Sequence, residues 1–428
     1  MIRDILLLQK RELQKRLEEK YIARDIDTAR FNSDIIKVII GPRRAGKSFF
    51  AIHMLDKLGS FGYANFDDEK LLEVKDYDEI VNTLNSLYNN PKYLLFDEIQ
   101  NLEKWELFVN RLQRQGYNLV ITGSNSKLLS RELATHLTGR HILINIFPFS
   151  FKEFLELEDR ELTASEIKTK LFSYATHGGY PEPLIKNLDH RDYLSTLVNS
   201  VIYKDIIKRF RIRSAQAIED LATYLISNNA GEYSYNTLSR VTGCKSVHTV
   251  EKYLDHLKES FLFFTLNRFS FKVKEQLSFN RKIYCIDNGL IYARAFRISP
   301  DIGRLYESIV AIELKKTEQK GDAHIYYWKN AQHEEVDFVV RQGLKVKELI
   351  QVCHNLGDIK TKEREIRALL KAGEELRCKN LSVITGDYEA EEEPEWFGIK
   401  GKIKFIPLWK WLCHHAVEQN LPKQEKVL

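Results

Sequence analysis

An apolar run at residues 35–40 leads directly into a short glycine-containing segment, and an amphipathic stretch follows it. The segment consists of Gly41, Pro42, Arg43, Arg44, Ala45, Gly46, Lys47 and Ser48. These residues fit the pattern G-x-x-x-x-G-K-[ST], in which glycines let the backbone wrap around a phosphate group and turn its N–H groups toward the anion. Such a loop needs a strand before it and a helix after it, and the flanking residues are suited to both. The segment therefore predicts a parallel α/β fold with a phosphate-binding loop.

The end of this loop carries the chemistry of a nucleoside triphosphate site. Lys47 is expected to reach the β- and γ-phosphates, and the Ser48 hydroxyl is expected to bind Mg²⁺, while Phe49 extends the nucleotide-binding stretch. A glycine-rich turn that merely joins a strand to a helix is the alternative interpretation. Because the flanks fit as well as the loop, the pattern favours ATP and Mg²⁺ as the ligands.

A second apolar run, residues 93–96, ends in Asp97 and Glu98. Ligands of an open parallel sheet bind at the carboxyl ends of its strands, so both acids are expected beside the phosphate loop. Asp97 is expected in the Mg²⁺ shell, and Glu98 is expected to be the base that orients and activates the attacking water. The alternative is a pair of acids that only caps the strand end.

A third apolar run, residues 119–122, ends in small polar residues. A polar side chain at this strand end would lie between the γ-phosphate and the water, and Ser124 or Asn125 suits that role. The same residues also suit the N-cap of the next helix, and one side chain can serve both purposes.

Short apolar runs alternate with amphipathic stretches through this part of the chain. Five of them are expected to be strands: 35–40, 61–66, 92–98, 117–123 and 141–147. Such alternation favours a parallel sheet with helices on both faces. Before the first strand, residues 4–24 carry apolar side chains at helical spacing and are expected to form a helix.

The composition is typical of a globular protein of the cytoplasm. Apolar residues make up 43% of the chain and charged residues 29%. No apolar run reaches the length of roughly 18–20 residues that a membrane span needs, and the charged N-terminus is unlike a signal peptide. The five cysteines are scattered without C-x-x-C spacing, so neither a disulfide framework nor a zinc site is expected. The net charge of +5 leaves a nucleic-acid partner open.

The order of motifs along the chain resembles a known family. GPRRAGKS, LLFDEIQN, ITGSN, LTGR, FPFSFKEF and GGYPEP together resemble the archaeal and bacterial AAA-type ATPases that carry a PD-(D/E)xK-like C-terminal domain. The resemblance covers nearly the whole chain and implies a multidomain α/β protein. The expected parts are an N-terminal helical lead-in at 1–33, a P-loop ATPase core at 34–148, a helical lid at 149–215, a winged helix at 216–280 and a degenerate nuclease-like domain at 281–428.

The resemblance also implies roles that the residues alone do not fix. Arg140 resembles the arginine finger that AAA proteins present to a neighbouring subunit, which implies a homo-oligomer in the active state. Without the family, Arg140 is a favourable charge at the C-terminal end of a helix. Pro181 resembles a lid residue that contacts the nucleotide base, although its segment alone reads as a turn. Residues 21–24 either line the adenine or simply end the first helix.

Residues 235–260 have the spacing of a helix-turn-helix, with a turn at Gly243. The following residues, 261–274, alternate like a β-hairpin wing. In DNA-binding examples the second helix enters the major groove and the wing meets phosphates. The candidate DNA contacts are Lys245, His248, Lys252 and Arg268. The same helix carries acids that repel phosphate, so a winged helix that binds protein partners is the alternative.

The C-terminal region has the element order of the PD-(D/E)xK nuclease core. This core needs acids for Mg²⁺ and a lysine beside them. Glu307 and Asp337 fall at the first two acidic positions, but Gln351 and Cys353 stand where the pattern expects E-x-K. A lysine of the next helix, Lys360 or Lys362, is the candidate substitute. The region is therefore expected to be a degenerate nuclease site, kept as a scaffold or binding remnant.

Together these observations predict Mg²⁺-dependent ATP binding and hydrolysis, coupled to conformational change on or near DNA. One rival is a slow ATP switch that recruits protein partners through the winged helix and the C-terminal domain. The other rival is an ATP-regulated nuclease.

Overall fold

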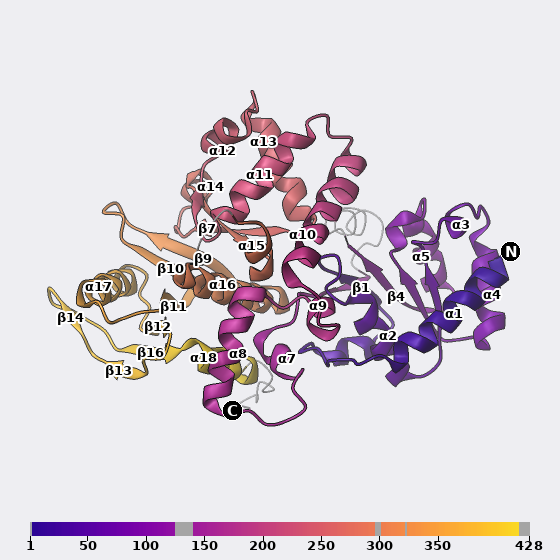
Figure 1. Ribbon diagram of the computed structural model, residues 1–428, viewed down its shortest axis with the longest axis horizontal. Helices are drawn as coiled ribbons and strands as arrows, with labels where there is room; N and C mark the ends of the chain where they lie inside the picture. The colour runs from indigo at the N-terminus through magenta and orange to yellow at the C-terminus, as the bar shows by residue number, and fades with distance from the viewer. Residues whose placement is uncertain (1, 125–139, 296–300, 322, 419–428) are drawn as a thin grey trace. The chain divides into compact units, whose positions relative to one another are not determined.

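The computed structural model describes residues 2–124, 140–295, 301–321 and 323–418, and the chain divides into two compact units (Figure 1). The first unit consists of Met1–Phe149 with the short segments Leu184–Asn187 and Glu259–Phe261, and the second unit comprises the remainder. Across these described ranges, no helix is long and apolar enough to cross a membrane. Each unit is built around a sheet of its own.

The first unit contains a five-stranded parallel sheet with the strand order β2-β3-β4-β1-β5. Its strands are β1 (Ile36–Ile40), β2 (Phe61–Asn65), β3 (Tyr93–Asp97), β4 (Asn118–Gly123) and β5 (His141–Asn145). Its helices and helical turns in the described ranges are α1 (Ile2–Glu18), η1 (Thr28–Asn32), α2 (Lys47–Leu58), α3 (Glu69–Leu72), α4 (Tyr77–Tyr88), η2 (Ile99–Asn101) and α5 (Trp105–Arg114). The parallel sheet that the sequence predicts is thus present with all five expected strands.

Side chains along β1 alternate between two apolar layers, because successive residues of a strand point to opposite faces of the sheet. Ile36, Val38 and Ile40 belong to the layer that contains residues of α4 and α5, whereas Ile39 belongs to the layer formed with α2. Strand β1 is buried along its whole length, as is usual for an inner strand of a sheet covered on both faces. The loop that follows β1 emerges at the carboxyl edge of this sheet.

The second unit contains a mixed nine-stranded sheet with the strand order β13-β16-β12-β11-β10-β9-β7-β8-β6. Its strands are β6 (Glu232–Tyr233), β7 (Phe263–Arg268), β8 (Arg281–Cys285), β9 (Ala323–Lys329), β10 (Glu335–Gln342), β11 (Lys345–Cys353), β12 (Leu381–Thr385), β13 (Ala390–Glu392) and β16 (Ile403–Pro407). The short strands β14 (Glu395–Trp396) and β15 (Ile399–Lys400) pair only with each other. The chain is therefore an α/β protein in which a parallel sheet is followed by a mixed one.

Helices of the second unit lie before, between and after these strands (Figure 1). Those before β6 are α7 (Phe151–Leu155), α8 (Ala164–His177), α9 (Pro181–Ile185), α10 (His190–Ser200), the π-helix η3 (Val201–Lys208) and α11 (Ala215–Ser227). Those that follow are α12 (Tyr235–Thr242), α13 (Val247–Glu259), α14 (Val273–Ser278), α15 (Asn288–Arg294), α16 (Ile302–Lys320), α17 (Ile359–Glu375) and α18 (Leu408–Glu418).

The β-hairpin wing predicted within residues 261–274 is wrong. Strand β7 ends at Arg268, and its antiparallel partner is β8, which lies beyond the helix α14. The Ser270 hydroxyl accepts a hydrogen bond from the Lys272 N–H (3.1 Å) and donates one to Glu275 (2.7 Å). Such side-chain bonds to nearby groups compete with strand pairing, so the chain turns into a helix where alternation alone suggested a second strand.

Strand β7 also pairs in parallel with β9, and this pairing joins residues 216–280 to the C-terminal region in one sheet. The helix and strand order predicted for that region is present as α16, β9, β10, β11, α17 and β12. Buried residues of α17 pack with β10, β11, β12 and β16 in one apolar cluster. The predicted boundary at residue 280 falls between two neighbouring strands of this sheet, β7 and β8.

A buried aspartate fixes the glycine pair after α8. Asp287, the N-cap of α15, accepts hydrogen bonds from the N–H groups of Gly289 and Gly179, each at 2.8 Å. Gly178 has a left-handed φ of 77°, and a Cβ at this residue would lie 1.8 Å from Asp287 Oδ1. Only glycine fits there. Burial raises the pKa of Asp287 to about 6, although both amide bonds favour the ionised form.

This pKa predicts how stability changes with pH. The pKa of Asp287 is higher in the folded chain than in an unfolded one. Its contribution to the free energy of unfolding is therefore fully present below about pH 4, and it is lost as the pH rises through about 6. Between pH 4 and pH 7, Asp287→Asn should therefore gain roughly 2–3 kcal/mol in unfolding free energy relative to the wild type. Urea unfolding at several pH values measures this difference. Asp301→Asn, at the half-exposed N-cap of α16, is the control, and parallel pH profiles for wild type and Asp287→Asn would contradict the prediction.

Candidate active site

The loop between β1 and α2 has the conformation that its glycines permit. Gly41 has φ 152° and Gly46, the N-cap of α2, has φ 93°, both in the region that favours glycine. A Cβ at Gly41 would lie 2.0 Å from the Ile146 carbonyl oxygen, so no other residue fits. Helix α2 begins at Lys47, which directs its N-terminal N–H groups toward the loop. This geometry is suited to binding an anion.

Lys47 lies across the loop. Its side chain is buried, and its Nζ donates hydrogen bonds to the carbonyl oxygens of Gly41 (3.2 Å) and Pro42 (2.9 Å). The ammonium group is thereby held at the concave side of the backbone where the sequence expects phosphate oxygens.

Asp97 lies at the centre of a buried hydrogen-bond network at the ends of β3 and β4. Its Oδ1 accepts hydrogen bonds from the Ser48 hydroxyl (2.8 Å) and from the Thr122 hydroxyl, and its Oδ2 accepts one from the Tyr63 hydroxyl (3.2 Å). Burial, reinforced by the charge of Glu98, raises the pKa of Asp97 above its usual range. A divalent cation beside it would favour the ionised form and offset the cost of burial.

Glu98 is held in place by the neighbouring strand. Its backbone is left-handed (φ 50°), and its N–H donates to the Thr122 hydroxyl at 3.1 Å. Its carboxylate oxygen Oε2 accepts hydrogen bonds from the Ser124 hydroxyl (3.2 Å) and from the Gln100 amide. The structure therefore brings Ser124 to Glu98, while Asn125 lies outside the described residues.

Three residues of this region were missed or left uncertain by sequence reasoning. Tyr63 holds Asp97 and in turn accepts a hydrogen bond from Arg16 of α1 (3.2 Å). Arg24 donates to the carbonyl oxygens of Ala45 in the loop (3.2 Å) and of Phe147. These contacts join residues that are far apart in the sequence, and no local motif marks them.

The remaining predicted nucleotide residues lie at different places. Phe49 is on α2, with its ring 5.5 Å from that of His53, which also stacks on Tyr21 at 4.1 Å. Arg140 is exposed at the start of β5, where its carbonyl oxygen accepts a hydrogen bond from Ile36 (3.3 Å). Pro181 belongs to the second unit, where it is buried at the start of α9.

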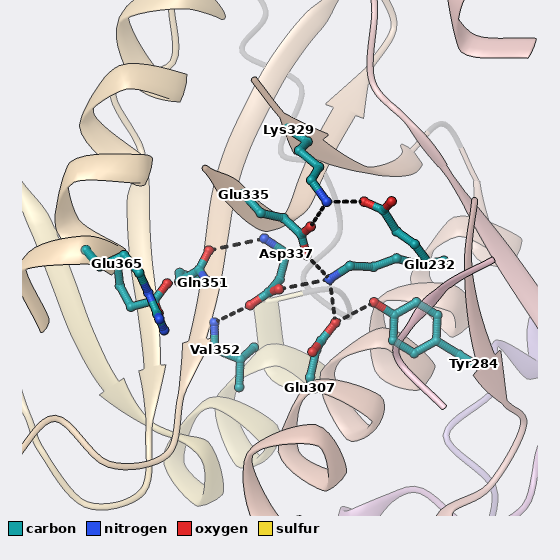
Figure 2. Close-up of polar contacts among 11 residues, drawn as sticks. Glu232, Tyr284, Glu307, Lys329, Glu335, Asp337, Gln351, Val352 and Glu365 are labelled. Atoms are coloured by element: carbon teal, nitrogen blue, oxygen red, sulfur yellow. Dashed lines mark hydrogen bonds and ion pairs between the residues drawn. The ribbon is translucent and has the colours of Figure 1, made fainter. Parts of the chain in front are cut away.

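Glu307 and Asp337, the predicted acids of the nuclease-like region, lie close together (Figure 2). Each pairs with Lys282 of β8, whose Nζ is 2.8 Å from Glu307 Oε1 and 3.1 Å from Asp337 Oδ1. Gln351 of β11 accepts a hydrogen bond from the Asp337 N–H (3.2 Å) and donates one to Glu365 (2.6 Å). Figure 2 also shows Glu335 turned toward the same centre.

The lysine at this centre is not one of the two expected from the sequence. Lys362 pairs with Glu392 at 2.7 Å, and Lys360 is exposed, so the expected substitutes lie elsewhere. Lys282 was missed because it is 55 residues from Asp337 in the chain and on a strand assigned to no catalytic motif.

The candidate DNA contacts fall into two groups. Lys245, His248 and Lys252 are exposed at the start of α13 and along it. Arg268, in contrast, donates to the Lys329 carbonyl oxygen and lies 4.0 Å from the centre of the Phe279 ring. The contact of Arg268 with phosphate stays a prediction, and its guanidinium group also has these two partners within the fold.

Comparison with known proteins places these sites in a family. Residues 33–155 match a family described as an AAA domain, and residues 168–301 and 302–411 match two domains of unknown function, DUF8612 and DUF4143. The uncharacterized protein MJ1544 of Methanocaldococcus jannaschii is 34% identical over 411 residues, covering 92% of this chain and 91% of that protein. The chain belongs to the same family. Its AAA domain implies ATP binding and hydrolysis.

Two further similarities extend the comparison. An uncharacterized protein of Haemophilus influenzae is 31% identical over 381 residues, covering 82% of this chain and 93% of that protein. A Walker-type ATPase of Pyrococcus abyssi superposes with a TM-score of 0.40 at 15% identity, over 66% of this chain and 94% of that one. The family is thus found in an archaeon and in a bacterium.

The Tyr63 hydroxyl generates a prediction about metal dependence. Tyr63→Phe removes one hydrogen bond from Asp97 and should raise the Mg²⁺ concentration needed for half-maximal ATP turnover by about 3- to 10-fold, since such a bond contributes about 0.5–1.5 kcal/mol. Turnover measured against Mg²⁺ at saturating nucleotide tests this. Tyr117→Phe, whose hydroxyl bonds Asn85 at 2.7 Å, is the matched control. Equal Mg²⁺ dependence in wild type and Tyr63→Phe would remove this role.

Proposed function

We propose that the protein is a Mg²⁺-dependent ATPase in which Lys47, Ser48, Asp97 and Glu98 do the chemistry. The observation that supports this best is the hydrogen bond from Ser48 at the end of the loop to Asp97 at the end of β3 (2.8 Å). The bond brings together, from two separate motifs, the two groups that such ATPases use for the metal.

The residues fit Mg²⁺ and ATP on structural grounds. The loop backbone has the conformation that its two positive-φ glycines permit, and a buried lysine lies across it. Ser48 and Asp97 are oxygen ligands of the kind that Mg²⁺ prefers, either directly or through water. When bound, Mg²⁺ neutralises charge on the β- and γ-phosphates. In this assignment Lys47 leaves the loop carbonyls to contact the phosphates.

In this proposal Glu98 accepts the proton of the attacking water. Ser124 and Gln100 bond the same oxygen of Glu98 and orient the carboxylate, while Thr122 bonds both the Glu98 N–H and Asp97. A non-glycine residue at φ 50° is energetically costly, and such backbone is often found where a side chain must be aimed. Thr122, at the end of β4, thus connects the proposed base, Glu98, to the proposed metal ligand, Asp97.

We further propose that Arg140 acts on the nucleotide of a neighbouring subunit and that Pro181 contacts the base from the lid. The exposure of Arg140 at the edge of β5 is compatible with a role between subunits. An arginine suits this role because its planar guanidinium group neutralises charge on a transferring phosphoryl group.

For the output of the ATP cycle we propose conformational change on or near DNA. Lys245, just before α13, and His248 and Lys252, on α13, are exposed side chains that follow the left-handed turn at Gly243. The side chain of Glu251 is 3.6 Å from His248, so the surface is not uniformly basic. Contacts from such a surface are mainly to phosphates and weaken with salt.

A second output, the recruitment of a protein partner, is favoured by a specific observation. Phe271, Val273 and Leu277, within and just before α14, are 71%, 68% and 65% exposed. Exposed apolar side chains gathered in one short segment are typical of protein contacts rather than of phosphate contacts. The engagement of Arg268 within the fold points the same way.

Turnover tests the ATPase assignment. Glu98→Gln should lower turnover by about 10²- to 10⁴-fold while ATP binding is kept, because the base is lost and the loop is intact. Glu103→Gln, an exposed glutamate five residues further on, is the control.

Turnover per subunit should also rise with protein concentration as subunits assemble through Arg140. Unchanged turnover in Glu98→Gln would refute the base, and constant turnover during assembly would refute the role of Arg140.

DNA binding tests the preferred output. Lys245→Glu with Lys252→Glu should weaken binding to a DNA duplex several-fold at low salt without changing ATP affinity, because phosphate contacts are lost. Lys360→Glu with Lys379→Glu changes the charge equally at exposed residues elsewhere in the unit and should leave binding intact. Fluorescence anisotropy at several salt concentrations measures both. Absence of DNA binding by the wild type at low salt would select the protein-recruiting output instead.

A further inference from the structure

Three carboxylates of the nuclease-like region converge on a single atom. The Nζ of Lys282 lies 2.6 Å from Glu335 Oε1, 2.8 Å from Glu307 Oε1 and 3.1 Å from Asp337 Oδ1. Only 4% of the Lys282 side chain is exposed. Carboxylates that surround a buried position need a cation among them, because burying an unpaired charge costs much free energy.

The number of N–H donors on the Lys282 ammonium group equals the number of carboxylate oxygens around it. Lysine has three N–H donors, and three carboxylate oxygens surround it at hydrogen-bonding distance. Magnesium would instead require oxygens at about 2.0–2.1 Å in an octahedral arrangement that keeps several waters. The cluster is thus arranged around the lysine as its cation.

Other groups of the chain also bond to the three carboxylates (Figure 2). Glu307 Oε1 also accepts a hydrogen bond from the Tyr284 hydroxyl (2.7 Å), and Asp337 Oδ2 accepts one from the Val352 N–H (3.0 Å). Glu335 Oε2 is 3.3 Å from Lys329, which also pairs with Glu232 at 2.6 Å. Each of the three acids therefore has a second partner within the chain besides Lys282.

Gln351 explains why the third acid of the nuclease pattern is absent. Its side chain is buried, its oxygen accepts from the Asp337 N–H, and its nitrogen donates to Glu365. An amide can both accept and donate in this way, whereas an ionised carboxylate can only accept. A glutamate at this position would lose the donor and face the Glu365 carboxylate, so a metal ligand here conflicts with the present packing.

Burial and the neighbouring charges shift the pKa values of Lys282 and Asp337. Burial alone would lower the pKa of Lys282, but the attraction of Glu307 and its neighbours raises it well above its usual range, which keeps the lysine charged. Burial and then repulsion from Glu307 raise the pKa of Asp337.

We infer that Lys282 is the resident cation of the former nuclease site and holds the position that a divalent metal would need. The site is thereby converted into a closed ion-pair centre. It ties β6 and β8, next to α12 and α13, to α16, β9 and β10 of the C-terminal region. This inference is independent of the proposed ATPase function.

The rival to this assignment is a lysine that has moved to a new strand but still serves catalysis. A catalytic lysine would stand beside the bound metal and contact the attacking water or the reacting phosphate. Lys282 instead lies between the acids, where it competes with the metal for the same oxygens.

Metal binding tests the inference in the full-length, nucleotide-free chain, with Ser48→Ala added to weaken the metal site of the ATPase. Lys282→Ala should bind Mn²⁺ at least about tenfold more tightly than its parent in calorimetric titration, because the competing cation is gone. It should unfold at lower temperature without metal and recover several degrees with Mn²⁺. Adding Asp337→Asn should abolish this gain. A folded Lys282→Ala that binds no additional Mn²⁺ would overturn the inference.

Two further measurements keep the test decisive if Lys282→Ala does not fold. Lys282→Met with Glu335→Gln removes one charge of each sign and should unfold several degrees above Lys282→Met alone, whereas equal midpoints would overturn the ion-pair role. The parent chain should neither bind Mn²⁺ in a manner that depends on Asp337 nor cut DNA with Mn²⁺. Cleavage by the wild type that disappears in Lys282→Arg and in Asp337→Asn would establish the catalytic rival.

Discussion

The first unit depends on one buried carboxylate. Asp97 is the point at which the loop after β1, the end of β3 and the end of β4 meet, through Ser48 and Thr122. Its burial makes the ionised form costly, and the three hydroxyl donors around it reduce that cost without removing it. A site arranged in this way is stabilised further by a cation. Metal affinity and the packing of the strand ends are therefore aspects of the same arrangement.

The second unit depends on strand β8 in a similar way. Lys282 on this strand holds the acids of α16 and β10, and Asp287 just beyond its end holds the glycine pair after α8. One short strand and the residues after it thus connect the helical segment, the strands beside α12 and α13, and the C-terminal sheet. Both anchors are buried charges that bond to groups distant in the chain, and such groups favour one arrangement because unpaired alternatives are costly.

The features that the sequence predicted are those encoded in neighbouring residues. The loop at Gly41 could be recognised because its glycines are needed at positions with positive φ angles. Asp97 and Glu98 could be recognised because they follow an apolar run. The absence at Gln351 of the E-x-K pattern expected for a nuclease site was equally visible. What replaced it was not, because Lys282 and Asp337 are 55 residues apart and a lysine in a strand has no distinctive pattern. The partnership of Tyr63 and Asp97 was hidden for the same reason.

Failures at shorter range have a different cause. Residues 261–274 alternate as a hairpin would, but Ser270 bonds to Lys272 and Glu275, and helix α14 begins at Val273. The DNA contact of Arg268 stays a prediction, but the sequence did not show that its guanidinium group also contacts the Phe279 ring and the Lys329 carbonyl oxygen. Hydrophobic alternation and charge indicate which structures a segment can form. Side-chain hydrogen bonds to nearby groups then select among those structures.

The position of Lys282 has a consequence for how such proteins change by recombination. The two domains of unknown function meet between residues 301 and 302, so the lysine belongs to one and the acids Glu307 and Asp337 to the other. An exchange at that junction that brought in a partner without the lysine would leave buried carboxylates unneutralised, at a cost of about 3–5 kcal/mol. A replacement module on either side of the junction would therefore have to supply its own member of these ion pairs.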